Sequence, residues 1–418
     1  MTGLNNVLAK CKESKKVYIY GDGEVGRLTR VFLHEQGIEI DGFITTYAPK
    51  RSEVMSVPVC ELDAFTVDPN DVYVLVCMHK KWWEAVLNSL SEREYKNVDI
   101  IDDDLRIEID NKVRFADLYD DVEKNINVLL YHRVENLPTA YSIIVNERNF
   151  ESQLKYIKSN YNLLSCADDW SNVNEKSVAL TFDDGYVDFY SKTYPLLKKY
   201  NVPATVFVST GGIDNNKEFW WDELEMLLSE EHLPSTICTK RKEYVVSQYP
   251  NRALLIMDVR NEVIENTYKV RDEEIALLRK QIKPMAKDRS AYRTMNSEEI
   301  VALSKDPLIT IGAHTINHIL CDKESYDIQK HEIKESKEVL EALINKETNL
   351  FAYPNGNIGK DTRDILDELG FEKSFTCEHA CIDRVEKKFD IPRSAVLNWD
   401  ESQLERRFRG MWQTSKDI

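Results

Sequence analysis

Residues Val178-Ala179-Leu180-Thr181-Phe182 form an apolar run that continues directly into Asp183-Asp184-Gly185. The run predicts a buried β-strand, and the polar residues mark its C-terminal end. Two adjacent carboxylates at a strand end project to different sides, so one can bind a metal ion while the other faces a substrate. Asp-Asp-Gly is also a common turn sequence, so the stretch alone leaves both interpretations open.

Apolar runs of this kind recur through the C-terminal two-thirds of the chain, mostly separated by segments with helical spacing. They occupy residues 128–131, 178–182, 204–208, 308–312, 350–353 and 391–396. The alternation predicts a barrel-like α/β domain over residues 126–418, with polar residues at the C-terminal ends of its strands. A stretch rich in Glu, Leu, Arg and Lys interrupts this pattern and predicts a helical insertion at about residues 213–305.

A smaller parallel α/β domain is predicted over residues 1–115. Strand and helix signals alternate there in short units, at residues 17–20, 24–36, 38–44, 71–76, 82–90 and 98–101. Such alternation is typical of a Rossmann-like sheet. Residues 102–121 are strongly charged with little periodicity, and we interpret them as the boundary between the two domains.

The first turn of this domain carries a glycine motif, Gly21-Asp22-Gly23-Glu24-Val25-Gly26, between a predicted strand and a predicted helix. In this context the pattern can cradle a phosphate at the helix N-terminus. Gly21, Gly23 and Gly26 are therefore candidate cofactor-binding residues for a nucleotide or nucleotide-sugar. The loop is acidic, and residues 42–46 lack the carboxylate that would hold a ribose, so a structural or protein-contact role is the alternative.

Composition narrows the classes of partner. The 418 residues include 55 Lys and Arg against 72 Asp and Glu, a net charge of −17, which argues against binding to nucleic acid. No apolar stretch is long enough to span a bilayer, and the opening residues lack the apolar core of a signal peptide. Eight cysteines without a Cys-x-x-Cys indicate reduced packing thiols. We therefore expect a cytoplasmic protein without a transmembrane segment.

A second polar cluster, His314-Thr315-Ile316-Asn317-His318, follows the predicted strand at 308–312. Two imidazoles with one carboxylate form a usual catalytic zinc set that leaves a coordination position open. The alternative is one histidine in the core and one at the surface. The spacing is thus consistent with a metal site, but by itself it leaves both interpretations open.

The two clusters together resemble the NodB homology domain of polysaccharide deacetylases, carbohydrate esterase family 4, over roughly residues 126–400. The matching motifs are Thr181-Phe182-Asp183-Asp184-Gly185 and His314-Thr315-x-x-His318. The resemblance implies a distorted (β/α) barrel that removes an acetyl group from an N-acetylated sugar. It also implies that Asp183 is the general base and that Asp184, His314 and His318 bind a divalent metal, with Zn²⁺ favoured.

The third motif of the family is altered here, to Ala352-Tyr353-Pro354-Asn355-Gly356. The motif arginine that normally holds the catalytic aspartate is replaced by Ala352. Arg393 could supply the missing charge from the last strand, or could simply be a surface arginine. Asn355 occupies the position whose backbone N–H would face the oxyanion, and Tyr353 and Asn355 are candidate substrate-binding residues.

The family's usual general acid, a histidine in the last strand, is absent from residues 394–399. Tyr131-His132-Arg133-Val134 ends the first strand of the domain and resembles a Tyr-His-x-Val motif of the poly-N-acetylglucosamine deacetylases. The resemblance implies that His132 is the general acid. His379 is a weaker candidate for the same role. A structural role for His132 is the alternative.

Two tryptophans in the insertion, Trp220 and Trp221, could line a saccharide cleft or could anchor the insertion to the barrel. The leading hypothesis is a cytosolic metal-dependent deacetylase in surface-polysaccharide biosynthesis, with nucleotide- or lipid-linked sugars among the candidate substrates. The alternatives are a catalytically decayed carbohydrate-binding or scaffolding protein on the same fold, and a nicotinamide-dependent nucleotide-sugar oxidoreductase that uses the glycine loop.

Overall fold

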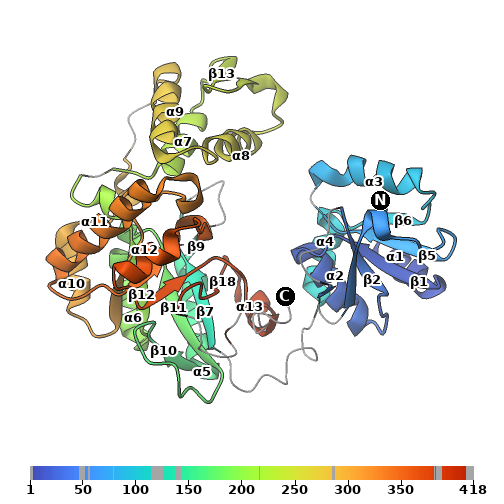
Figure 1. Cartoon of the computed structure of the whole chain (residues 1–418), viewed down its shortest axis with the longest axis horizontal. Coiled ribbons are helices and arrows are strands. Elements are labelled where there is room, and N and C mark those ends of the chain that lie inside the picture. Colours follow the sequence, from blue (N-terminus) through green and yellow to red (C-terminus); the bar gives the residue numbers. More distant parts are fainter. Residues whose placement is uncertain are drawn as a thin grey trace. The chain divides into compact units, whose positions relative to one another are not determined.

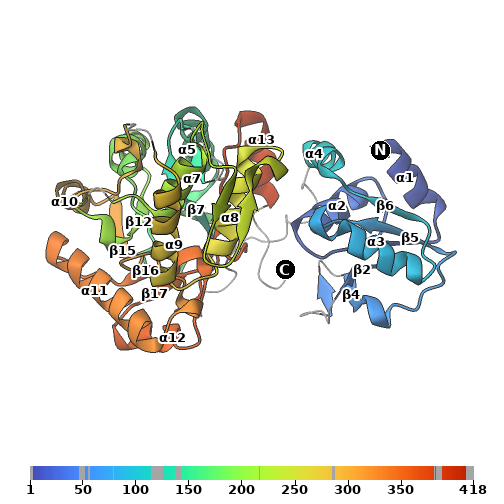
Figure 2. The ribbon, with the colours of Figure 1, turned by 90° about the horizontal axis from the view of Figure 1, so that it is seen from above.

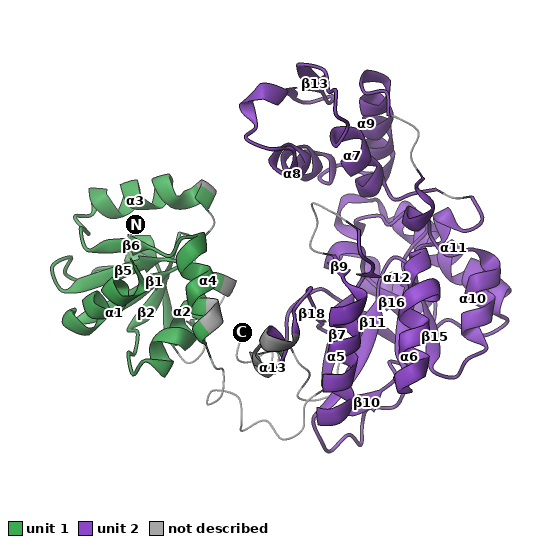
Figure 3. Cartoon of the chain, turned by 180° about the vertical axis from the view of Figure 1, so that it is seen from behind, with its two compact units in different colours: residues 1–121, 405–418 green, residues 122–404 purple. Residues whose placement is uncertain are grey.

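The computed structural model divides into two compact units, residues 1–121 with 405–418, and residues 122–404 (Figure 3). It describes residues 3–46, 52–54, 57–78, 80–113, 126–137, 143–215, 217–284, 288–380, 382 and 388–410. The boundary predicted from the sequence between residues 115 and 126 falls in the interval between described residues 113 and 126. Among the described helices, none is long and apolar enough to cross a membrane.

The first unit is built on a six-stranded sheet of order β3-β4-β2-β1-β5-β6 (Figure 1). Five strands pair in parallel, and only β3 (Glu53–Val54) runs antiparallel to its neighbour. The parallel strands are β1 (Lys16–Tyr20), β2 (Gly42–Thr45), β4 (Val57–Glu61), β5 (Val72–Val76) and β6 (Val98–Ile100). The predicted parallel α/β fold of this region is confirmed.

Helices cover both faces of this sheet. Side chains of α1 (Leu4–Glu13), α2 (Glu24–Glu35) and α4 (Asp103–Lys112) share one core, and α3 (Trp83–Glu92) packs in the other. Helix α4 lies in the stretch that we interpreted as a boundary, so that interpretation is wrong for residues 103–112. Its buried positions, Leu105 and Ile109, are four apart but stand among charged residues that hide the pattern.

The second unit is an eight-stranded parallel sheet of order β17-β16-β15-β12-β11-β7-β18, with β10 also paired to β11. Helices surround its outer side, including α5 (Glu147–Asn160), α6 (Tyr194–Tyr200), α11 (Tyr326–Ile344) and α12 (Thr362–Glu368) (Figures 1 and 2). The strands are β7 (Ile126–Tyr131), β10 (Asn162–Leu164), β11 (Ser177–Phe182), β12 (Ala204–Val208), β15 (Ile309–Ala313), β16 (Leu350–Ala352), β17 (Lys373–Phe375) and β18 (Ser394–Ala395). This curled sheet confirms the predicted α/β barrel class.

The last strand is shorter than the predicted run 391–396. Only Ser394 and Ala395 pair with β7, and Ile391 forms an isolated parallel bridge to Phe375. Pro392 between them has no N–H to donate to a ladder, which interrupts the strand. The sheet is thus nearly closed between β17 and β18, as expected for a distorted barrel.

The insertion forms a lobe with its own core. It contains α7 (Trp220–Leu228), α8 (Arg252–Val263) and α9 (Tyr268–Gln281), whose buried side chains include Leu224, Leu255 and Leu278. It is not wholly helical, because β13 (Thr236–Cys238) and β14 (Glu243–Val245) form an antiparallel hairpin. Three-residue strands are too short to produce a detectable alternation in sequence. Helix α10 (Ser297–Ser304) leads back to β15.

Candidate active site

The candidate residues meet at the C-terminal edge of three parallel strands. In the register of the sheet, Phe182 of β11 lies beside Tyr131 of β7 and Val206 of β12, and Val208 lies beside Ala313 of β15. The residues that follow these strand ends are His132, Asp183 and His314. Their convergence therefore results from the parallel register rather than from nearness in sequence.

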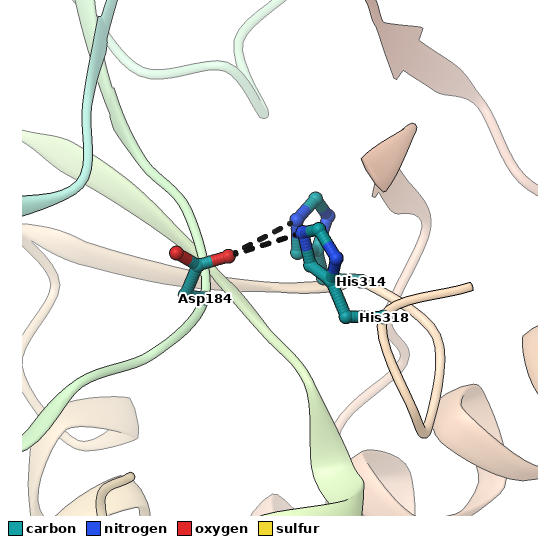
Figure 4. A group of neighbouring side chains, drawn as sticks. All are labelled: Asp184, His314 and His318. Atoms are coloured by element: carbon teal, nitrogen blue, oxygen red, sulfur yellow. Dashed lines mark ion pairs between the residues drawn. The ribbon is translucent and has the colours of Figure 1, made fainter. Parts of the chain in front are cut away.

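Asp184, His314 and His318 form a compact cluster (Figure 4). Asp184 Oδ1 lies 3.5 Å from His314 Nε2 and 3.4 Å from His318 Nε2. One nitrogen or oxygen atom from each residue lies within 4.8 Å of the others, and all three residues are buried. This arrangement can hold a metal ion.

Several residues of the site have left-handed backbone conformations. The φ angle is 75° at Asp184, 61° at Thr315, 49° at His318 and 57° at Asn355. Such conformations are unfavourable for residues with a Cβ and persist only when neighbouring contacts impose them. Here Ser209 provides two of those contacts, because its N–H donates to the carbonyl of Asp184 and its hydroxyl to that of His314.

The loop that carries His318 is held from both sides. Glu332, on α11, accepts hydrogen bonds from the backbone N–H groups of Ile316 and Asn317 at 3.0 and 2.8 Å. Arg271, on α9, donates to the carbonyls of Asn317 and His318 at 2.8 and 3.2 Å. Two buried side chains of opposite charge thus fix the backbone of this loop.

Hydrogen bonding and burial set the tautomer or the charge of each candidate ligand. His314 Nδ1 lies 2.8 Å from the carbonyl oxygen of Ala352; since that oxygen can only accept, Nδ1 donates the hydrogen bond and Nε2 is the nitrogen that faces Asp184. Burial lowers the pKa of His318 to about 3. Burial acts to raise the pKa of Asp184, but His314, His318 and His132 outweigh it and lower that pKa to about 2. An ionised carboxylate of Asp184 and a neutral imidazole of His318 therefore face one another at neutral pH, in the forms that bind a metal ion.

The donor set fits a divalent cation. The Oδ1 atom of Asp184 is buried and forms no hydrogen bond with any described part of the chain. Buried carboxylate oxygens are normally paired, and an ion between the three side chains would satisfy this one. Two nitrogen ligands and one oxygen ligand, with room for more, match the catalytic zinc sets.

Asp183 is paired with Arg393 by two parallel hydrogen bonds. Both guanidinium nitrogens lie 2.7 Å from carboxylate oxygens, and both side chains are buried. Arg393 is thus not a surface arginine. It contacts Asp183, the aspartate that the motif arginine would hold if position 352 were not alanine. Burial acts to raise the pKa of Asp183, but the charge and hydrogen bonds of Arg393, together with His314 and His132, outweigh it and lower that pKa, so the carboxylate stays ionised.

A cleft of about 60 Å³ opens at this cluster. It is lined by His132, Ile143, Asp184, Trp221, Arg260, His318 and Asn355. The structure thus brings His132, Asn355 and Trp221 to the cluster. Trp221 packs its ring on His318 with the centroids 4.7 Å apart, and its indole N–H donates to the Tyr186 hydroxyl at 2.8 Å.

Sequence reasoning missed two residues of this cleft, Ile143 and Arg260. Arg260 comes from α8 of the insertion, and no motif distinguishes it among the 55 lysines and arginines of the chain. Only the folding of the insertion back onto the barrel edge brings it to the cleft.

Three candidates belong neither to the cleft nor to the Asp-His-His cluster and its neighbouring Asp183–Arg393 pair. Tyr353 is fully buried, with its hydroxyl bonded to Ser374 and Asp390, so its side chain is a packing element and not a substrate contact. Trp220 lies in a different cavity, beside Arg271. Its neighbour Trp221 points elsewhere because adjacent helical residues diverge by about 100°. His379 is exposed and does not line the cleft.

The glycine motif belongs to the first unit, where it joins β1 to α2. A Cβ on Gly21 would lie 2.7 Å from the carbonyl oxygen of Cys77, and one on Gly26 would lie 1.9 Å from that of Gly21. Gly23 has open space around it. Backbone crowding alone therefore requires glycine at two of the three positions, and the nucleotide and nicotinamide roles remain predictions.

Fold and site together define a class: an α/β barrel with a buried Asp-His-His cluster beside an ionised aspartate. The model of the family described as polysaccharide deacetylase matches residues 171–273 and 279–374. These residues include Asp183, Asp184, His314 and His318. The barrel unit thus matches the model of the polysaccharide deacetylase family, which confirms the resemblance drawn from the motifs.

Individual relatives are distant. The chain is 22% identical over 276 residues to YxkH of Bacillus subtilis, a protein named for this family, and covers 70% of its length. It is 32% identical over 128 residues to a poly-beta-1,6-N-acetyl-D-glucosamine N-deacetylase of Staphylococcus aureus, but covers only 43% of that protein. These matches span 64% and 26% of the present chain.

Two solved structures share parts of this architecture at low similarity. The deacetylase PplD of Streptococcus pyogenes, in complex with acetate, has a TM-score of 0.45 at 20% identity, covering 68% of this chain and 98% of that one. IcaB from Ammonifex degensii has a TM-score of 0.46 at 18% identity, covering 68% and 97%.

Proposed function

We propose that this protein is a metal-dependent deacetylase that hydrolyses the acetamide of an N-acetylated saccharide. The observation that carries the proposal is the Asp184–His314–His318 cluster beside the ion-paired Asp183, at the edge of a barrel of this family. The same edge carries His132 and Asn355 in one cleft. Removal of an acetyl group needs a base, an acid and stabilisation of an oxyanion, and this set offers all three.

Asp184, His314 and His318 are the proposed metal ligands, and zinc is the proposed ion because of its preference for nitrogen and oxygen ligands. When bound, the ion supplies Lewis acidity toward the acetamide carbonyl. The hydrogen bond from His314 to Ala352 orients that ring, and the contacts of Glu332 and Arg271 orient the loop of His318.

Asp183 is the proposed general base. Its carboxylate is held ionised by Arg393 and takes the proton of the attacking water. His132 is the proposed general acid, which donates a proton to the departing amine nitrogen. Asn355, on an exposed turn with φ of 57°, offers its backbone N–H toward the oxyanion.

Trp221 is the proposed wall for a sugar ring, since indole faces pack against the C–H faces of saccharides. The name of the staphylococcal relatives supports a β-1,6-linked N-acetylglucosamine polymer as one substrate class. The sequence predicts a nucleotide- or lipid-linked sugar as the other, together with a cytoplasmic location. Release of acetate from β-1,6-linked oligomers and from UDP-N-acetylglucosamine, compared on one preparation, separates these classes.

The test measures metal and activity together. The purified chain, stripped with a chelator and reloaded with zinc, is expected to bind one equivalent and to release acetate from an N-acetylated oligosaccharide. His318→Ala should abolish both. His331→Ala is the matched control, because His331 is an exposed histidine of α11 outside the cluster. Full metal content in His318→Ala, or no acetate release by the loaded protein on any acetylated saccharide, would overturn the proposal.

A further inference from the structure

A second cavity, of about 250 Å³, lies between the insertion and the loop after β15. Its lining includes Lys217, Trp220, Arg271, Thr294 and Asn317, and it shares no lining residue with the cleft at His132 and Asp184. The volume is comparable to that of one sugar residue. Nothing in the proposed deacetylation uses this space.

Three buried side chains around this cavity keep a hydrogen-bond donor unused. They are Arg271 at Nε, Trp220 at Nε1 and Thr294 at Oγ1, and none of these atoms forms a hydrogen bond with the described part of the chain. The residues are only 2%, 7% and 3% exposed. Buried donors are normally paired, so three of them around one cavity indicate a ligand rich in acceptors.

The charge of Arg271 points to the kind of acceptor. Its two terminal nitrogens donate to the carbonyls of Asn317 and His318, which carry no net charge. A guanidinium stays protonated in proteins, so the side chain carries a positive charge. Among the described residues it has no ion pair.

The carboxylates of the cavity, in contrast, have cationic partners. Glu223 pairs with Arg279, Glu218 with Arg289, and Asp272 lies 3.9 Å from Lys217. An anion that enters the cavity thus meets a buried guanidinium that has no direct ion pair, although Asp272, Glu324 and Glu332 lie near enough to act on its charge. The carboxylates that line the cavity each have a cationic partner of their own.

We propose that this cavity binds a small anionic ligand of about the size of one sugar residue. Its oxyanion, a carboxylate or a phosphate, would accept hydrogen bonds from Arg271 Nε, Trp220 Nε1 and Thr294 Oγ1. The ligand would lie behind the loop of His318, because Arg271 also holds that loop. The inference does not depend on whether the neighbouring cleft catalyses deacetylation.

Isothermal titration calorimetry on the full chain tests the proposal with four probes: N-acetylglucosamine 6-phosphate, glucuronate, inorganic phosphate and neutral N-acetylglucosamine. At least one of the two charged sugars is expected to bind about tenfold or more tightly than the neutral sugar. Comparison of the affinity for N-acetylglucosamine 6-phosphate with that for glucuronate shows whether the cavity prefers a phosphate or a carboxylate. Inorganic phosphate tests whether the sugar body contributes.

The titrations are made on metal-free protein, so that an anion bound by a metal in the neighbouring cleft is not counted. Thr294→Val and Trp220→Phe each remove one donor with little change in shape, and each should weaken the charged ligand about fivefold to tenfold. Arg271→Lys should weaken it further. Arg260→Gln, a cation of the other cleft, is the control and should leave the affinity unchanged.

Thermal unfolding of each variant checks that the fold is retained. If Arg271→Lys does not fold, the two single-donor variants still decide the question. Equal affinity for the neutral and charged sugars, no binding of either charged sugar, or charged-sugar binding that is unaffected in both Thr294→Val and Trp220→Phe would overturn the proposal.

Discussion

Arg393 reaches Asp183 from 210 residues away in the chain and takes over a contact for which the motif position, Ala352, has no side chain. The guanidinium also donates to the carbonyl of Thr376 and to the hydroxyl of Thr181, so most of its donors are used. In a fully buried ion pair of this kind, removal of either side chain leaves the charge of the other buried without compensation.

Arg393→Met is expected to lower the free energy of unfolding by about 3–5 kcal/mol, because it leaves the Asp183 carboxylate buried without its cation. Asp183→Asn in the same background should recover part of that loss. Urea denaturation of the four proteins of this cycle measures the coupling. Strictly additive losses would show that the two side chains do not interact in solution.

Asp183→Asn alone should keep bound metal but lose about 10²- to 10⁴-fold in deacetylation rate, the range for a lost general base. Metal analysis and acetate release on one preparation provide both readings. An Asp183→Asn protein with unchanged turnover would assign the base role to another residue.

His132→Gln should retain metal and lose turnover of an amide, while an aryl ester, whose leaving group needs no proton, should be much less affected. The ratio of the two rates is the informative measurement. Equal losses on both substrates would indicate that His132 binds or positions the substrate instead.

At the scale of elements, α11 supports the loop of the proposed ligand His318 through one buried side chain. Glu332 accepts three hydrogen bonds from Ile316 and Asn317. These bonds help to hold the flanking residues, Thr315 and His318, in their left-handed conformations. Contacts of this kind, one step away from a ligand, fix its orientation, and their loss weakens metal affinity.

Glu332→Gln is expected to weaken metal affinity by about 10- to 100-fold, because an amide has one acceptor oxygen where the carboxylate has two. Competition with a chromogenic chelator measures the affinity. Glu338→Gln on the same helix, with an exposed carboxylate, is the matched control. Loss of affinity in both variants would indicate a general effect on α11.

Helix α7 contains a buried acid in its first turn. Asp222 accepts a hydrogen bond from the Tyr186 hydroxyl at 2.5 Å, and burial raises its pKa to about 7 against the effects of Tyr186 and Arg133. The pKa of Asp222 is thus higher in the folded state than the value near 4 expected in the unfolded chain. The proton on Asp222 therefore stabilises the folded state fully below pH 4, and this stabilisation is lost as the pH rises through 7.

The free energy of unfolding should therefore contain a component that falls between pH 4 and pH 7 and disappears in Asp222→Asn. Denaturation at several pH values for both proteins measures it. Parallel pH profiles for the two proteins would show that Asp222 titrates normally.

At the scale of the whole molecule, the chain has two units, and every proposed ligand and catalytic residue belongs to residues 122–404. The glycine motif belongs to the other unit. Deletion of residues 1 to about 115 should therefore leave metal binding intact and preserve activity on a simple acetylated oligosaccharide. Activity on a nucleotide-linked sugar would fall if the glycine motif binds the nucleotide. A folded truncation that binds no metal would contradict this division.

The amino-acid sequence was sufficient for the class of fold, and it singled out Asp184, His314 and His318, which the fold brings together. Strand-length apolar runs at residues 178–182 and 308–312 are followed by Asp183-Asp184 and His314. This local pattern predicts the strands of the parallel sheet and places the motif residues at their C-terminal ends. Parallel strands present their C-terminal ends at one edge, so residues far apart in sequence could be expected at one site.

Only the tertiary structure determined what surrounds that cluster. It separated Trp220 from Trp221, buried Tyr353 against Ser374 and brought Arg260 into the cleft. It also paired Arg393 with Asp183, where the sequence left a surface arginine as an equal alternative. Side-chain direction and long-range pairing depend on how the insertion and the last strand pack on the barrel, and that packing has no local period for a sequence pattern to reveal.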